Sequence, residues 1–122
     1  MSLPYAIIIE PNESLHKPYS FMKDAYESDR CASIESGLSL LAKRSPDIVF
    51  LSSSYSISKM LKILEAIKHK SHLTLIPLVI VVDLSNRINN IPGTSWGNKI
   101  GIVTSISSVK EYNSTLNRVT TA

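Results

Sequence analysis

Small polar residues stand directly after the apolar runs of this chain, where a strand would end. Three serines, residues 52–54, follow the run 48–51, and Glu10 follows the run 5–9. Serines in that position could bind an anion or accept phosphate from a separate Ser/Thr kinase, and the carboxylate could hold a cation. The simpler interpretation, which we prefer, is that the serines satisfy loop backbone groups and that Glu10 is solvated or bonded to a backbone amide.

Nucleophilic catalysis by Ser52 would require a base. Serine is protonated at neutral pH, and Glu10 is the only nearby candidate to accept its proton. The three histidines show no metal-ligand spacing with the single cysteine, Cys31, so a zinc site is not expected. We therefore predict no catalytic residues, no metal and no cofactor.

Charge and aromatic residues bear on binding. The net charge of +3 is uneven: residues 1–53 carry −2 and residues 54–122 carry +5. A basic half is compatible with an acidic partner or nucleic acid, but a solvated helix face is the simpler interpretation. The lysines of 57–70 have no interleaved aromatic residues, so a nucleic-acid stripe is not indicated. Trp96 lies in a polar segment. Two roles are open for it: it anchors a binding partner, or it fills the edge of the core next to the weak fourth helix.

The elements that position these residues alternate between strand and helix. Apolar, β-branched runs predict strands that are buried on both faces of a sheet. A more polar strand is expected at the sheet edge. The predicted strands cover residues 5–9, 30–34, 48–51, 75–82 and 100–104.

Helices are expected between these strands because apolar residues recur at helical spacing. The first begins near Lys17 and carries Tyr26 on its apolar face, and the second is capped by Ser36. A capping box at residues 108–111 opens the last helix, which carries Tyr112. The third helix is the clearest, with an apolar face predicted to consist of Ile57, Met60, Leu61, Leu64 and Ile67.

Segment 83–98 departs from the helical pattern. It contains Pro92, two glycines and four asparagines, which make it a poor helix. We expect a loop there with at most one or two helical turns, so that the fourth helix is short or missing.

The chain has the size of one domain, expected to span residues 4–120, with residues 1–3 a candidate expression leader. Its lone Cys31 permits no intrachain disulfide and favours a reducing compartment. The longest apolar stretch, 73–82, is much shorter than the ~20 residues that cross a bilayer. No signal peptide is evident, and a cytoplasmic location is expected.

Alternating strands and helices predict a three-layer α/β/α domain with a parallel sheet covered on both faces. Five such units match the flavodoxin-like strand order 2-1-3-4-5. In that topology a ligand site lies at the carboxyl ends of strands 1 and 3, which here are Glu10 and Ser52.

The chain resembles the CheY-like receiver domain of bacterial response regulators over nearly its whole length. Three stretches carry the resemblance: Ala6–Glu10, Glu35–Leu38 with Pro46–Leu51, and Ile76–Val82. The spacings also match, with 30 residues from Ser52 to Val82 and 22 from Val82 to Thr104. Each motif is weak by itself, whereas their order and spacing together are specific.

The resemblance implies a phosphorylation site that has been dismantled. Receivers use an acidic pair for Mg²⁺, an acceptor aspartate, a hydroxyl, a lysine and an aromatic residue on strand 5. Glu10 keeps one acid, and Gly101 replaces the aromatic residue. The other matching positions have all changed type: Pro11 for the second acid, Ser52 for the acceptor, Val82 for the hydroxyl, Thr104 for the lysine and Ser105 for the proline after it.

We therefore predict a degenerate pseudo-receiver that works in signal transduction through protein contacts and has no enzymatic activity. Its expected partner is a histidine kinase, regulator or output domain, with no membrane and no nucleic acid. The predicted contact surface, which is also a candidate homodimer face, is formed by the fourth and fifth helical segments and includes Arg87, Trp96 and Tyr112. The alternatives are a small-molecule or anion sensor that uses the vacated pocket, and an active receiver whose acceptor is displaced to Asp47 or Asp83.

Overall fold

A five-stranded parallel sheet forms the centre of the molecule. The computed structural model describes residues 3–11, 26–70, 76–82, 100–104 and 109–120. The strand order is β2-β1-β3-β4-β5, as the sequence predicts. The strands are β1 (Tyr5–Ile9), β2 (Glu27–Cys31), β3 (Ile48–Ser52), β4 (Leu78–Val82) and β5 (Ile100–Thr104).

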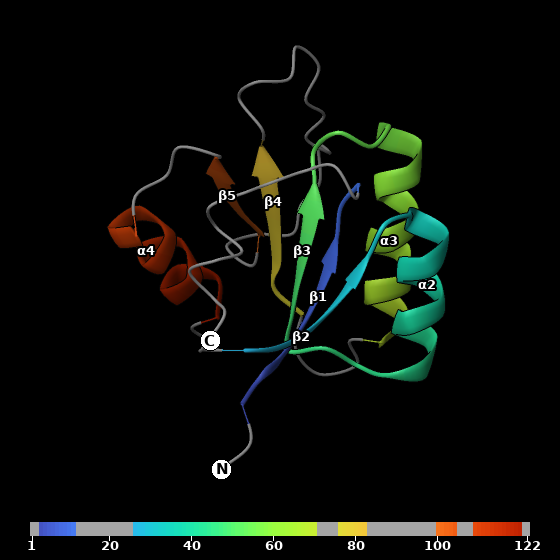
Figure 1. The fold of residues 1–122 in the computed structure, drawn as a ribbon, viewed down its shortest axis with the longest axis horizontal. Helices are drawn as coiled ribbons and strands as arrows, with labels where there is room; N and C mark the ends of the chain where they lie inside the picture. The colour runs from blue at the N-terminus through green and yellow to red at the C-terminus, as the bar shows by residue number, and fades with distance from the viewer. Residues whose placement is uncertain (1–2, 12–25, 71–75, 83–99, 105–108, 121–122) are drawn as a thin grey trace.

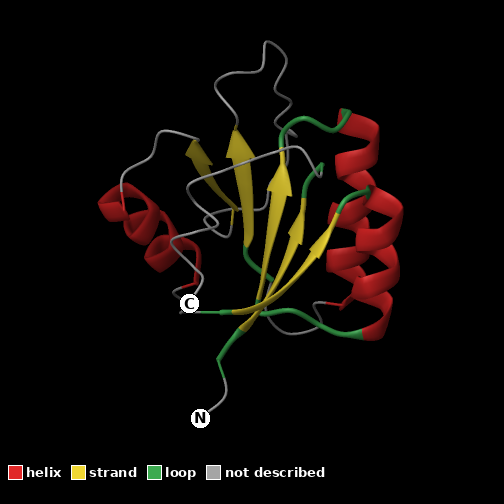
Figure 2. Ribbon diagram, viewed as in Figure 1, coloured by secondary structure: helices red, strands yellow, loops and turns green. Residues whose placement is uncertain are grey.

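Three helices in the described part of the chain cover this sheet on both sides. Helices α2 (Ile34–Lys43) and α3 (Ile57–Lys70) lie on one face, and α4 (Val109–Thr120) lies on the other (Figures 1 and 2). The arrangement is the predicted three-layer α/β/α fold. None of these helices is long and apolar enough to cross a bilayer.

The core has two halves because successive strand residues point to opposite faces. On the α2 and α3 side, alternate strand residues such as Ile7 and Leu51 pack with Met60 and Ile67 of α3. On the other side, Phe50 belongs to a cluster that includes Leu116 and Val119 of α4. Burial of a side chain of this size stabilises the fold by about 1.5–3 kcal/mol, which explains the unbroken apolar runs.

Strand β2 and the cap of α2 differ from the prediction. The strand spans Glu27–Cys31 rather than 30–34, so it starts and ends three residues earlier. Ser33, not Ser36, caps α2: its backbone is extended, and its hydroxyl accepts from the Ser36 amide at 3.1 Å. Ile34 is therefore helical and buried rather than the end of a strand.

Strand β4 starts later than predicted, at Leu78 instead of residue 75. Pro77 lies just before it and cannot donate a backbone hydrogen bond. Its carbonyl instead accepts from the Val49 amide at 3.0 Å, which aligns the start of β4 with β3.

The predicted helix faces are confirmed in part. Met60, Leu64 and Ile67 are buried, but Ile57 and Leu61 are exposed. Tyr26 lies outside a helix, directly before β2, with its ring edge-on to Phe50. Most of the first predicted helix, segment 83–98 and Ser108 lie outside the described residues.

Candidate functional site

The topology brings the predicted site positions to the carboxyl edge of the sheet. Ile9 of β1 pairs with Leu51 of β3, so the residues that follow them, Glu10 and Ser52, are at the same level. Ser52 pairs with Val81, and Val82 pairs with Thr104. This convergence of parallel strand ends is what the strand order predicts.

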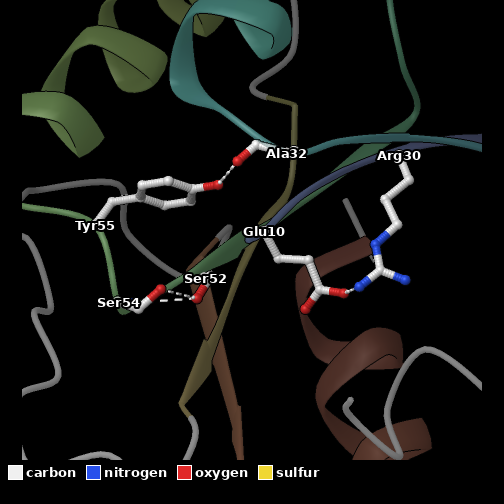
Figure 3. Close-up of polar contacts among 6 residues, drawn as sticks. All are labelled: Glu10, Arg30, Ala32, Ser52, Ser54 and Tyr55. Carbon is white, nitrogen blue, oxygen red and sulfur yellow. Dashed lines mark hydrogen bonds and ion pairs between the residues drawn. The ribbon is translucent and has the colours of Figure 1, made fainter. Parts of the chain in front are cut away.

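Glu10 is the buried charge of this edge. Its side chain is 0% exposed, whereas that of Arg30 on β2 is 45% exposed. Arg30 Nη2 donates to Glu10 Oε1, and Figure 3 shows the two side chains extending toward each other. A buried carboxylate requires a counter-charge, and here the guanidinium supplies it.

Sequence reasoning missed the Glu10–Arg30 pair because it placed β2 too late. With the strand at 30–34, Arg30 would stand at its beginning, at the opposite end of the sheet from Glu10. In the observed register Arg30 pairs with Ile8, and the Glu10 amide donates to the Cys31 carbonyl at 2.9 Å. The available signal was a single basic residue in a polar edge strand, which does not by itself identify a partner.

The Ser52 side chain makes hydrogen bonds within its own loop. It is buried at the end of β3, and its hydroxyl lies 2.8 Å from that of Ser54 and accepts from the Ser54 amide at 3.2 Å (Figure 3). The serine therefore satisfies a loop amide, as the simpler interpretation predicts. Its hydroxyl partner cannot accept its proton at neutral pH, so this contact does not activate a nucleophile.

Tyr55 connects the loop after β3 to the loop after β2. Its hydroxyl donates to the Ala32 carbonyl at 2.8 Å, across the top of the site (Figure 3). Burial raises the pKa of Tyr55 to about 12, with smaller effects from neighbouring charges. The sequence carried no signal for this contact, because it joins two loops whose relative position depends on the sheet order.

The remaining site positions provide little polar chemistry in the described structure. Val82 is buried and offers only hydrocarbon, and Pro11, half-buried, follows Glu10. Thr104 ends β5, but its side chain, like that of Tyr112 in α4, lies outside the described residues. Arg87 and Trp96 also lie outside them.

Gly101 has a structural reason to lack a side chain. A Cβ atom there would lie 2.6 Å from Thr115 Cγ2 and 2.9 Å from Val119 Cγ1, both on α4. Real Cβ atoms do not approach other atoms so closely. Helix α4 thus occupies the space that an aromatic residue at this position would need.

Asp47 is not a displaced phosphate acceptor at this edge. It lies immediately before β3, at the amino end of the sheet, where its Oδ2 accepts from the Tyr5 amide at 2.7 Å. A five-residue strand separates it from the loop after β3, about 16 Å along the strand. Asp83 lies outside the described residues. Within the described part, no group of three His, Cys, Asp or Glu side chains is placed to hold a metal ion.

Comparison with known proteins identifies the fold. No family model matches the sequence, and no curated protein matches it. Solved structures do match, including a CheY-like response regulator receiver domain from Methylobacillus flagellatus, with a TM-score of 0.65, 14% identity, and coverage of 97% of this chain and 99% of that one.

Two further structures extend this finding. The chemotaxis response regulator CheY4 of Vibrio cholerae has a TM-score of 0.67 at 13% identity, over 97% of this chain and 99% of that one. HP1043, an orphan response regulator of H. pylori, has a TM-score of 0.58 at 20% identity, over 95% and 96%. At these identities the likeness concerns the fold, and the chain has the fold of CheY-like receiver domains.

Proposed function

We propose that this protein is a degenerate receiver domain that acts in signal transduction through protein contacts, independently of phosphorylation. The observation that carries the proposal is the pairing of Glu10 with Arg30 at the carboxyl edge of the sheet. In the receiver fold this edge is where an acidic pair would hold Mg²⁺. A guanidinium next to the one remaining acid opposes the binding of a second cation.

The rest of the edge supports the same proposal. Phosphoryl transfer depends on positioning and on neutralising the charge that develops on the phosphoryl oxygens. Ser52 is engaged with Ser54, and Val82 contributes no hydroxyl. The protein is therefore expected to transmit signals without a reaction of its own.

The proposed contact surface comprises segment 83–98, β5 and α4. Ile102 supports the β5 part of this surface: this large apolar side chain on the sheet-edge strand is 47% exposed. It lies in register with Ile80, so it points to the sheet face opposite α4. Arg87, Trp96 and Tyr112 are the sequence-predicted members of the same surface. We propose a kinase, regulator or output domain as the partner, with a homodimer as the alternative occupant.

Incubation with acetyl phosphate and Mg²⁺ tests the absence of phosphoryl chemistry. We expect the intact mass of the protein to remain unchanged, while an active receiver incubated in parallel gains one phosphoryl group. A phosphoryl adduct on this chain would overturn the proposal.

The contact surface is tested with Ile102→Glu and Trp96→Ala. A stoichiometric partner recovered with the wild-type protein should be lost with both variants and kept with Leu61→Glu, a matched apolar-to-acid change on α3. Sedimentation velocity of the same variants tests the homodimer. Retention of partner and oligomeric state in both surface variants would contradict this surface.

The sensor alternative has less support in the described residues. Glu10 and Ser52, two of its expected lining residues, are buried and bonded to groups of the chain itself. Thermal-shift screening with nucleotides, quinones and anions separates the two functions, because only a sensor is expected to be stabilised by such a ligand.

A further inference from the structure

Strand β2 differs from the inner strands of the sheet in how little of it is buried. Its residues Glu27 to Arg30 are exposed, whereas β1, β3 and β4 are buried along their whole length. Within the described structure, Cys31 is the one β2 residue that belongs to either core cluster. Burial of a single small side chain gives β2 little of the apolar stabilisation that the inner strands have.

Polar side chains supply most of the other contacts of β2. Asp29 accepts from the Tyr5 hydroxyl of β1 at 2.6 Å, in a partly buried position. Glu27 pairs with Arg44, the cap residue of α2, at 3.2 Å. This second pair is exposed at both ends, so water and salt weaken it.

The Glu10–Arg30 pair is the strongest of these side-chain contacts. The Glu10 carboxylate is fully buried at the end of β1, and Arg30 reaches it from β2. When β2 separates from β1, the carboxylate loses the guanidinium while it still lies beside the apolar end of β1. Loss of a counter-charge at a buried site opposes this separation.

Contacts on both sides of β2 limit the segment that can separate. Tyr26, directly before the strand, places its ring edge-on to Phe50 in the core. Directly after the strand, the Ala32 carbonyl accepts from the Tyr55 hydroxyl at 2.8 Å. The segment between these two contacts is the strand itself, Glu27–Cys31.

We propose that β2 is a releasable edge strand: it opens as a local unit while the rest of the sheet stays folded, and the Glu10–Arg30 pair sets how often it opens. Segments with few buried apolar contacts open with a smaller free energy than the whole fold. Opening uncovers the Cys31 thiol and the backbone groups at the edge of β1. The inference goes beyond the proposed function, because β2 and β5 form opposite edges of the sheet (Figure 1).

The test uses the full chain and dithionitrobenzoate, a reagent that reacts with accessible thiols. Cys31 is the single cysteine of the protein and serves only as the reporter. When the labelling rate is proportional to the reagent concentration, it measures the population of the open state. We expect an opening free energy below that of global unfolding and almost independent of urea, because release of one edge strand exposes little surface.

Arg30→Ala should raise the Cys31 labelling rate about tenfold or more in the absence of urea. Val119→Ala is the control, because it removes core packing under α4, on the sheet face opposite Cys31. This variant should lower the stability to global unfolding and leave the labelling rate unchanged. In the wild-type protein, hydrogen exchange measured by mass spectrometry should be faster across residues 27–31 than across residues 48–52.

Three results would overturn the inference. Labelling of Cys31 has the free energy and the urea dependence of global unfolding. Labelling of Arg30→Ala is no faster than that of the wild-type protein. Alternatively, residues 27–31 and 48–52 exchange together. The wild-type measurements need no variant, so they decide the question if Arg30→Ala does not fold.

Discussion

The Glu10–Arg30 pair joins a fully buried carboxylate to a half-exposed guanidinium. Removal of Arg30 should lower the stability of the protein more than removal of Glu10. Without Arg30, the negative charge of Glu10 remains buried beside an apolar core, whereas Arg30 without Glu10 can turn into water. The pair also connects the end of β1 to the sheet-edge strand β2, whose other charged side chains are exposed.

Arg30→Ala should therefore lower the free energy of unfolding by about 2–3 kcal/mol in urea denaturation. Glu10→Gln should cost less, and the double variant should be more stable than the sum of the single changes implies. Glu27→Gln is the control, because its bridge to Arg44 is exposed at both ends and should contribute little to the free energy of unfolding. Additive effects at Glu10 and Arg30 would contradict the pairing.

Tyr55 provides a pH-dependent readout of the contact between the two loops. Burial raises its pKa to about 12, so the folded protein keeps a neutral phenol while the unfolded chain ionises near its ordinary pKa of 10. The contribution of the neutral, buried Tyr55 phenol to the free energy of unfolding is complete below pH 10 and is lost as the pH rises from about 10 to 12.

We expect Tyr55→Phe to flatten the fall in unfolding free energy across that range, measured by urea denaturation at a series of alkaline pH values. Some dependence should remain, because burial also raises the pKa of Tyr26. Identical slopes for variant and wild type would show that the Tyr55 phenol is not protected in the folded protein.

At the scale of elements, α4 and β5 approach each other closely at Gly101. The two α4 residues nearest to a Cβ atom at this position, Thr115 and Val119, are β-branched and have little rotamer freedom. An added methyl group must therefore displace the helix. An aromatic side chain at this position would need the helix placed differently, so we expect no aromatic switch in this chain.

Gly101→Ala should destabilise the protein by about 1–3 kcal/mol through overpacking, measured by thermal or urea unfolding. Gly37→Ala is the matched control. A Cβ atom there meets the flexible end of Ile9 at 2.7 Å, and alanine favours the helix, so the two effects partly cancel. Equal losses of stability in the Gly101→Ala and Gly37→Ala variants would contradict this account of the α4 contact.

At the scale of the whole molecule, the proposed loss of phosphoryl chemistry is compatible with an intact receiver fold. Its sheet is stabilised by apolar burial on both faces, which does not depend on the chemistry of the carboxyl edge. A change of acceptor, metal ligand or lysine can therefore accumulate without loss of the fold.

Global stability should accordingly be insensitive to Mg²⁺ and acetyl phosphate. A ligand that binds only the folded state raises the melting temperature, so we expect shifts below about 1 °C with either compound or both. Differential scanning calorimetry with an active receiver as the positive control makes the measurement. A clear stabilisation by Mg²⁺ would show that the Glu10 carboxylate accepts a cation in spite of Arg30.

Apolar patterning was sufficient to predict the architecture. Continuous β-branched runs alternating with helical periodicity allow few topologies, and the match of the five units to the flavodoxin-like order 2-1-3-4-5 is confirmed. That Ser52 stands where a receiver would carry its acceptor aspartate follows from the resemblance and stays a prediction. Element boundaries were less certain: polar β2 lacked an apolar run to locate it, and placing its end at residue 34 moved the predicted cap of α2 from Ser33 to Ser36.

The amino-acid sequence alone determined the layers and which residues follow each strand, because these depend on local periodicity. Its match to the flavodoxin-like pattern supplied the strand order. Only the tertiary structure decided that Glu10 pairs with Arg30 and that α4 packs closely against Gly101. It also decided that Ile57 and Leu61 remain outside the core. These features depend on register and on how one element covers another. Both are set by contacts between residues far apart in the chain.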